Sequence, residues 1–257
     1  MPKAVVRLLF LLSAMLGLAA SAASAPPASK PRLLVFSYST GFRHASIEAG
    51  VAALEAMGKR RGFDVVASAD PAVFSTDGLR GFQAIVLVSN TTRRNDPASE
   101  WFVGERRTAL QDFVHRGGGI VGIHAASDSH YHWPWYGRMI GGWFQHHPKG
   151  TPGGVVTLAE PRHPAARGLA SPRRRTDEWY YFESQPTAPV IATLDPASIG
   201  EEETGPKPMA WAHEFEGGRV FYTAMGHTPE SFAEPWFLQH LEGGIDWVLR
   251  RQGLRAE

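Results

Sequence analysis

The hydrophobic pattern of the first half of the chain alternates between short apolar runs and amphipathic segments. Apolar runs of strand length lie at residues 33–38, 63–67, 82–88 and 120–124. Apolar positions at three- and four-residue steps predict helices over residues 46–61 and 105–115. The strands are apolar throughout, which is typical of a parallel sheet covered on both faces. We therefore expect an α/β fold with a mostly parallel sheet.

The pattern changes after Trp143. Little helix separates the strand-like segments that follow, which are residues 155–158, 179–182, 190–194, 209–215 and 219–223. We expect them to add antiparallel strands in the C-terminal half or to form a flap. Glu216-Gly217-Gly218 predicts a hairpin between the last two strands. Residues 231–250 carry a helical pattern despite Gly243-Gly244. With no repeat and no linker, we predict a single domain over residues 32–252.

The N-terminus has the features of a secretory signal peptide. Lys3 and Arg7 precede an apolar run at residues 8–20, and small residues end at Ala25. The run is shorter than the ~20 residues that span a bilayer. We predict cleavage of residues 1–25, a tether at residues 26–31, and a bacterial-type protein exported to the periplasm or beyond, without membrane association after cleavage.

Charge and cysteine content exclude some functions. The formal net charge is +1, and removal of Lys3 and Arg7 would change it to −1, so no electrostatic attraction to nucleic acid is expected. We interpret the basic clusters 93–94 and 173–175 as solvated loops. The chain has no cysteine, which excludes thiol nucleophiles and thiolate metal sites. Any metal would need His, Asp or Glu ligands.

Polar residues follow three of the predicted strands, at residues 40–44, 89–92 and 124–128. Ligands of a parallel α/β sheet bind beyond the carboxyl ends of its strands, so these loops predict one shared site. His124 ends the glycine-rich segment 117–123, at the corner where hydrolases of this architecture present a nucleophile. A histidine there is a base, a metal ligand, a hydrogen-bonding anchor or a buried structural residue.

Further histidines and carboxylates favour a functional cluster. A set of two histidines and one carboxylate, such as His124, His146 and Glu178, would suit zinc, iron or manganese. No fixed metal motif is present, and a His/Asp pair performs acid–base chemistry without metal. The sequence indicates no cofactor other than this open choice of a divalent metal.

Asp177 and Glu178 precede an aromatic run, a combination that lines many sugar sites. Adjacent strand residues point to opposite faces, so the two carboxylates are not expected to act as a pair. Gly226 permits a tight turn that directs His227 over the sheet edge. The alternative interpretation is that His227 is the residue that precedes a helix capped by Thr228. The predicted catalytic residues are His44, His124, Asp128, Glu178 and His227. The predicted substrate contacts are Arg43, Asn90, Trp135, Tyr136, His146, His147, Asp177 and Tyr181.

Several ordered segments together resemble the ThuA-like (trehalose utilisation) family of the class I glutamine amidotransferase-like superfamily. They are residues 36–44, 117–126, 133–136, 144–148, 176–180 and 224–227. The resemblance implies a three-layer, flavodoxin-like fold with His124 at the elbow where amidotransferases carry cysteine, so glutaminase activity is not expected. It also implies a role with trehalose and related disaccharides, including 3-keto sugars.

Three functions remain open at this point. The first is an exported enzyme that hydrolyses or eliminates a disaccharide or 3-keto-glycoside at the histidine-rich site. The second is a non-catalytic carbohydrate-binding or accessory module. The third is a metal-dependent hydrolase of a substrate other than a sugar. A small-molecule carbohydrate is the expected partner, and the sequence does not define the oligomeric state.

Overall fold

A computed structural model describes residues 30–202 and 205–250. The predicted signal peptide and residues 26–29 of the predicted tether lie outside the described residues. Within the described residues, the search for membrane spans found no helix with the length and apolar character to cross a bilayer.

The described chain alternates strands and helices in its first half and consists mainly of strands in its second. The strands are β1 (Arg32–Phe36), β2 (Asp64–Ser68), β3 (Ala84–Val88), β4 (Gly119–Ile123), β5 (Phe144–His146), β6 (Gly153–Leu158), β7 (Arg173–Thr176), β8 (Tyr181–Phe182), β9 (Val190–Asp195), β10 (Lys207–Phe215) and β11 (Gly218–Thr223). The helices are α1 (Ile47–Arg61), α2 (Glu105–His115), α3 (Pro134–Ile140) and α4 (Pro235–Val248).

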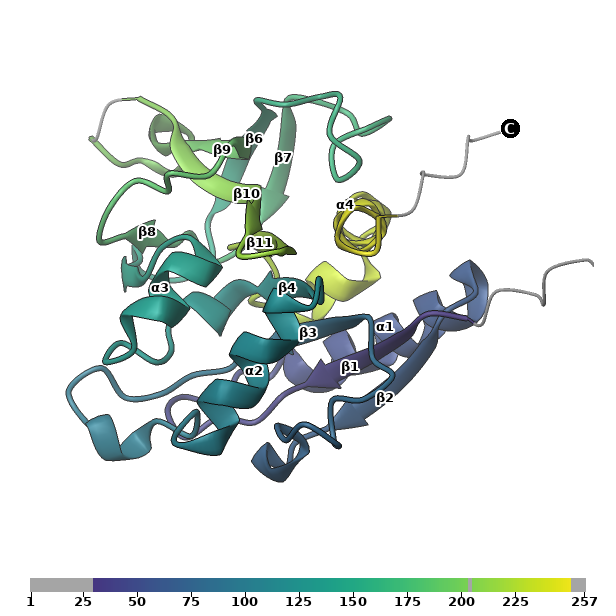
Figure 1. Ribbon diagram of the computed structural model, residues 1–257. Coiled ribbons are helices and arrows are strands. Elements are labelled where there is room, and N and C mark those ends of the chain that lie inside the picture. The colour runs from purple at the N-terminus through teal and green to yellow at the C-terminus, as the bar shows by residue number, and fades with distance from the viewer. Residues whose placement is uncertain (1–29, 203–204, 251–257) are drawn as a thin grey trace, which may run out of the picture.

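One nine-stranded sheet organises the molecule, in the order β2-β1-β3-β4-β11-β10-β9-β6-β7 (Figure 1). The pairings from β2 to β11 are parallel, and those from β11 to β7 are antiparallel. The predicted α/β fold with antiparallel additions in the C-terminal half is therefore confirmed. Successive reversals give β7 the same direction as β4 and β11, so all three end at the same edge of the sheet.

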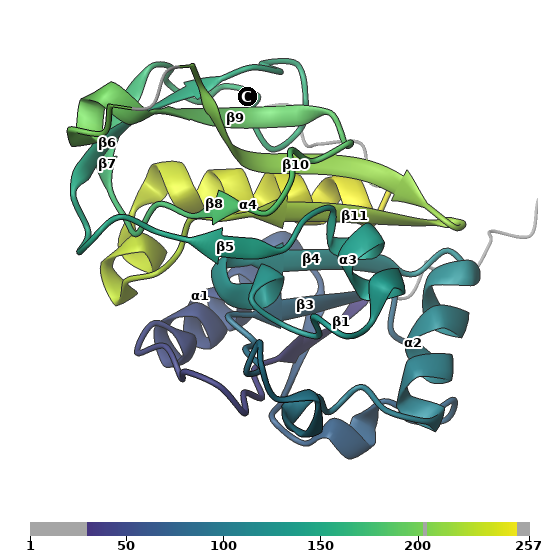
Figure 2. The same ribbon diagram turned by 90° about the vertical axis from the view of Figure 1, so that its left-hand side faces the viewer.

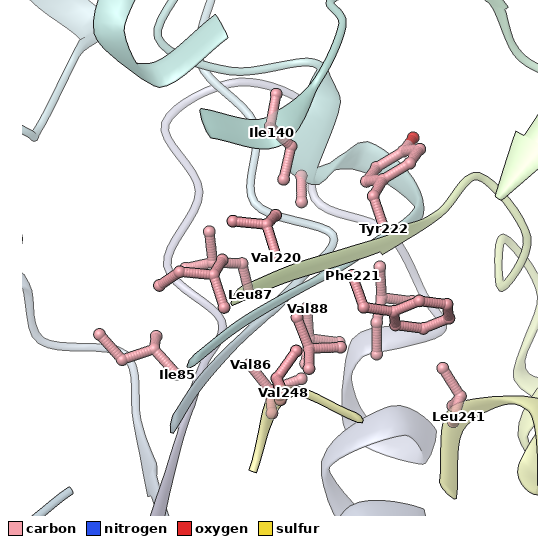
Figure 3. Packing of buried hydrophobic residues seen from close by; sticks show 14 of the residues in the cluster. Ile85, Val86, Leu87, Val88, Ile140, Val220, Phe221, Tyr222, Leu241 and Val248 are labelled. Atoms are coloured by element: carbon pink, nitrogen blue, oxygen red, sulfur yellow. The ribbon is translucent and has the colours of Figure 1, made fainter. Parts of the chain in front are cut away.

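Helices cover both faces of the parallel strands, with α1 and α4 on one face and α2 and α3 on the other (Figures 1 and 2). Side chains of β3 and β11 alternate between these layers: Val88 and Phe221 point toward α4, while Leu87 and Tyr222 point toward Ile140 of α3 (Figure 3). This two-sided burial explains why the predicted strands are apolar at every position.

Besides β5, a strand that was not predicted, three elements differ from the sequence-based expectation. The segment predicted as a strand at 179–182 is shortened to β8, which pairs with β5 in a separate two-stranded sheet. The short helix α3 was not predicted. The third difference is β7, whose three arginines were interpreted as a solvated loop although Arg175 is buried and paired with Asp177 and Glu234.

The glycine pair inside α4 is explained by close packing. A Cβ atom on Gly243 would lie 2.1 Å from the carbonyl oxygen of Pro164, and one on Gly244 would lie 2.3 Å from the ring of Phe221. Both distances are too short for a real contact. The glycines therefore let α4 approach β11 and the loop between β6 and β7 more closely than any other residue would.

Gly243→Ala tests this account. In an exposed helix, alanine in place of glycine stabilises by up to ~1 kcal/mol. Here we expect the exchange to destabilise by about 1–3 kcal/mol, because the new methyl group overpacks the contact with Pro164. Denaturant unfolding measures the change, and Ala56→Gly at an exposed position of α1 serves as the matched exchange in the reverse direction. A Gly243→Ala protein more stable than wild type would contradict the packing argument.

Buried histidines in the core predict a loss of stability in mild acid. Burial lowers the pKa of His240 to about 4, against the opposing effect of its 2.6 Å hydrogen bond to the Ala165 carbonyl. Burial likewise lowers the pKa of His130 and His163 to about 4. A histidine whose pKa is lower in the folded state binds fewer protons there than in the unfolded chain. Stability is therefore complete above the unfolded pKa of about 6.5 and falls as the pH drops toward 4.

We expect His240→Gln to make the free energy of unfolding less dependent on pH. The contribution of one histidine to this slope is at most about 1.4 kcal/mol per pH unit. The free energy of unfolding, measured at intervals between pH 4 and pH 8, checks this. The variant should differ from wild type by a constant amount above pH 7 and approach it below pH 6. Parallel profiles down to pH 4 would count against the prediction.

Candidate active site

The sequence places His124 directly after β4, at a sharply turned corner. Its φ of +49° lies in the left-handed region, which side chains other than glycine seldom adopt. The Tyr222 hydroxyl donates to the His124 carbonyl at 2.7 Å, and the Tyr136 hydroxyl donates to the Ala126 carbonyl at 2.7 Å. Two buried tyrosines thus hold the strained turn, and the His124 side chain is directed beyond the sheet edge.

His44, His124, Glu178 and His227 meet at this edge, and one potential ligand atom of each lies within 4.8 Å of the other three. His124 Nε2 lies 3.1 Å from His227 Nδ1 and 3.4 Å from Glu178 Oε2. His227 Nδ1 lies 3.1 Å from the same Glu178 oxygen. We call these four residues the histidine centre. It is the one group of metal-ligand spacing within the described parts of the chain.

Asp177 fixes the backbone of two members of the histidine centre, Glu178 and His227. Its carboxylate accepts hydrogen bonds from the backbone N–H groups of Glu178, Gly226 and His227 at 2.9–3.0 Å. It also pairs with Arg175 at 2.7 Å, with both side chains buried. Asp177 therefore joins the end of β7 to the turn after β11, and its neighbour Glu178 points into the centre.

The electrostatics of the centre favour an ionised Glu178. Burial opposes its ionisation, but the flanking His124 and His227 side chains prevail and hold the pKa of Glu178 well below its usual range. Burial likewise opposes protonation of His227, but the Glu178 carboxylate raises the pKa of His227 above its usual value. Burial, with the neighbouring His124 and His227, lowers the pKa of His44 to about 2. The centre thus combines an ionised carboxylate with two imidazoles, those of His44 and His227, whose pKa values are shifted in opposite directions.

A second acid–base group lies close by. Burial raises the pKa of Asp128 to about 6, despite its hydrogen bond from Tyr131 and the nearby charges of Arg94 and His124. Its carboxyl group therefore exchanges a proton near neutral pH, which is the property that general acid–base catalysis requires.

Aromatic rings surround the centre. The ring of Tyr180 lies 4.2 Å from that of His124, and the ring of Phe144 lies 4.1 Å from Tyr180. Phe42 is 67% exposed and meets His44 edge-on. His147 Nδ1 lies 3.3 Å from Glu178 Oε1, on an exposed side chain. The polar groups of the centre are therefore flanked by the buried Tyr180 ring on one side and by the exposed Phe42 ring on another.

Comparison with known proteins identifies the family. The family model described as "Trehalose utilisation", named ThuA, matches residues 32–248. The chain belongs to the ThuA family. This membership connects the protein with carbohydrates, and it confirms the resemblance carried by the sequence segments. No curated protein matches the chain.

Solved structures agree on the fold of this ThuA protein. A ThuA-like protein from Bacteroides uniformis superimposes with a TM-score of 0.70 at 22% identity, covering 88% of this chain and 94% of that one. A ThuA-like protein from Parabacteroides merdae gives 0.69 at 18% identity, with coverages of 88% and 93%. PurLQS from Thermotoga maritima gives 0.56 at 14% identity, with coverages of 85% and 99%. The fold is therefore class I glutamine amidotransferase-like.

The structure brings four of the five predicted catalytic residues into the histidine centre of this ThuA protein and places the fifth, Asp128, nearby. Among the predicted substrate contacts, His147 borders the centre. Arg43 lies on the loop that carries His44 and forms an exposed ion pair with Glu48. Asn90 is fully buried and donates to the Tyr38 carbonyl, so it supports the first loop from inside.

The other predicted contacts do not line the centre. His146, which was also a candidate metal ligand, stacks on Tyr181 at 5.0 Å, because β5 pairs with β8. Trp135 donates to Glu216, next to the hairpin at the opposite edge of the sheet. Tyr136 is buried beneath the His124 turn, and Asp177 is occupied by Arg175 and backbone groups. These last three residues support the structure rather than line an open site.

Sequence reasoning missed Tyr180 and Phe42. Tyr180 stands two positions after Glu178, and side chains two positions apart in an extended segment share a face. This spacing could have identified Tyr180 once Glu178 was assigned to the site. For Phe42 the available signal was its position between Gly41 and Arg43, an apolar ring in a polar loop.

Asp177→Asn tests whether the buried carboxylate is structural. We expect a loss of about 3 kcal/mol in the free energy of unfolding, because the buried Arg175 loses the buried one of its two carboxylate partners and keeps only Glu234. Denaturant unfolding at pH 7 measures this, and Asp77→Asn, which removes the exposed partner of Arg80, should leave stability close to wild type. Equal stabilities of the two variants would show that Asp177 does not hold this end of the sheet.

Proposed function

We propose that this protein is an exported carbohydrate-processing enzyme that hydrolyses or eliminates a disaccharide or 3-keto-glycoside at the histidine centre. The observation that carries the proposal is the convergence of His44, His124, Glu178 and His227 at the carboxyl edge of the sheet. Family membership supports a carbohydrate as substrate. The N-terminal pattern of Lys3, Arg7 and a short apolar run supports export to the periplasm or beyond.

The chemistry of a 3-keto-glycoside suits these groups. Its C2 hydrogen is acidic because it lies next to the carbonyl carbon. Removal of that proton and departure of the C1 substituent, protonated as it leaves, give an unsaturated ketone. Addition of water across the new double bond then completes a net hydrolysis. The same site would therefore catalyse elimination and hydrolysis in sequence.

The residues divide these tasks. The polar side chains of the histidine centre stabilise the negative charge that develops on the enolate. Asp128, with its pKa near 6, exchanges the proton. The exposed Phe42 provides an aromatic face for the C–H side of a sugar ring, while the buried Tyr180 packs against His124 and supports the centre. Glutaminase chemistry is not part of the proposal, because the elbow carries His124 and the chain has no cysteine.

The test is turnover of disaccharides and their 3-keto derivatives by the purified protein, with and without divalent metal. We expect His124→Ala to abolish turnover, and Asp128→Asn to lower kcat by ~10²–10⁴-fold because the proton-exchanging group is lost. His115→Ala is the matched control, since this exposed histidine pairs with Glu216 away from the centre. Circular dichroism establishes that each variant is folded.

Two outcomes would overturn the proposal. Calorimetric binding of these sugars without turnover would favour a non-catalytic binding module. Full activity in a folded His124→Ala protein would show that the histidine centre is not where the reaction occurs.

A further inference from the structure

We propose that His44, His124, Glu178 and His227 bind one divalent transition-metal ion. This inference concerns the same centre as the proposed function. Turnover tests the proposed function, whereas metal binding tests this inference. The first argument is the spacing of three donor atoms. His124 Nε2, Glu178 Oε2 and His227 Nδ1 are separated by 3.1, 3.1 and 3.4 Å. Ligands bonded at ~2.0–2.1 Å to one tetrahedral ion lie roughly 3.3 Å apart, so the triangle has the size of a coordination face.

The second argument is that hydrogen bonds orient the donors. His124 Nδ1 faces the Ala224 carbonyl at 2.7 Å, and because a carbonyl can only accept, this nitrogen carries the hydrogen. Nε2, the nitrogen free to bind a metal through its lone pair, is therefore directed into the centre. Metal-binding histidines generally show this arrangement, with the second ring nitrogen donating to a carbonyl or carboxylate. Asp177 fixes the other two donors through their backbone, because its carboxylate accepts from the N–H groups of Glu178 and His227.

The third argument is His44. Its side chain is 4% exposed, and its ring lies 4.8 Å from that of His124 and 5.2 Å from that of His227. Within the described residues its Nδ1 has no hydrogen-bond partner. Burying an imidazole among two others without a hydrogen-bond partner for this nitrogen is costly. A ligand role, with the ring placed as the fourth donor, accounts for a histidine at this position.

The donor set indicates the class of metal. Three imidazoles and one carboxylate suit zinc, iron(II) or manganese, whereas calcium and magnesium prefer oxygen ligands. Glu178 supplies the negative charge, and its partial exposure together with that of His227 leaves access from solvent. The competing arrangement has a hydrogen on His227 Nδ1, shared between Glu178 and His124. A bound metal would replace that hydrogen.

The experiment measures metal directly. The full chain is purified without a polyhistidine tag and without chelator, and its metal content is determined by mass spectrometry. We expect close to one transition-metal ion per chain. Chelator-stripped protein should regain Zn²⁺ and show a higher Tm with it, and Co²⁺ should give visible absorption bands typical of nitrogen and oxygen ligands.

Glu178→Gln and His227→Ala should each weaken Zn²⁺ binding at least ~10-fold, because each removes a ligand. His115→Ala should bind as wild type. Glu178→Gln keeps the shape of the side chain, so it separates loss of the metal ligand from loss of folding, which circular dichroism checks.

Stripped wild-type protein that shows no Zn²⁺, Mn²⁺, Fe²⁺ or Co²⁺ binding would overturn the inference, as would unchanged affinity in both ligand variants. Stoichiometric metal without turnover of any carbohydrate would leave the metal site standing and contradict the proposed enzyme. Turnover by a wild-type protein that binds no metal would support the proposed enzyme and contradict the metal site.

Discussion

The carboxylate of Asp177 is the point on which the geometry of the site depends. It is fully buried, and it accepts from the Arg175 guanidinium and from three backbone N–H groups. Those contacts join the end of an outer antiparallel strand to the turn after β11. An unpaired carboxylate in this position would be costly, but each of its lone pairs is directed at a donor. As a result Glu178 and His227, 49 residues apart, face each other across 3.1 Å.

The opposite side of the centre depends on the strained turn at His124. A positive φ is maintained only where the surroundings favour it, and here the Tyr222 and Tyr136 hydroxyls hold the two carbonyls of the turn. Tyr222 belongs to β11, the strand that also leads to His227. The positions of the two histidines are therefore coupled through one strand, and substitutions in its buried face would displace both.

Elements whose formation depends on neighbouring residues could be predicted from the sequence, whereas elements that depend on distant contacts could not. Unbroken apolar runs predicted β1, β3 and β4, and helical spacing predicted α1 and α2, because two-sided burial leaves a direct trace in the sequence. By contrast, the sequence of β7 is polar, and no local pattern predicts a strand there. Arg175 can be buried because it pairs with Asp177 and with Glu234, which is 59 positions away in the sequence. The seven-residue helix α3 is too short to show a periodic pattern.

The same distinction applies to the site. His44, His124 and His227 were predicted because each follows a strand of the parallel set. His146 was included for its closeness in sequence, but the pairing of β5 with β8 turns it toward Tyr181. The choice between Asp177 and Glu178 could not be made in advance, since the two are adjacent and their directions depend on which of them Arg175 engages.

The β4–β11 pairing has a consequence for how the molecule assembles. It joins Gly119 to Arg219, and β11 is the last strand in the sequence although it lies in the middle of the sheet. Closing so long a loop carries an entropic cost before any contact compensates for it. The early strands can pair with one another as soon as they form, but His227 reaches His124 only when β11 docks. A chain interrupted before that step would hold the parallel part β2-β1-β3-β4, an exposed apolar edge at β4, and no complete centre.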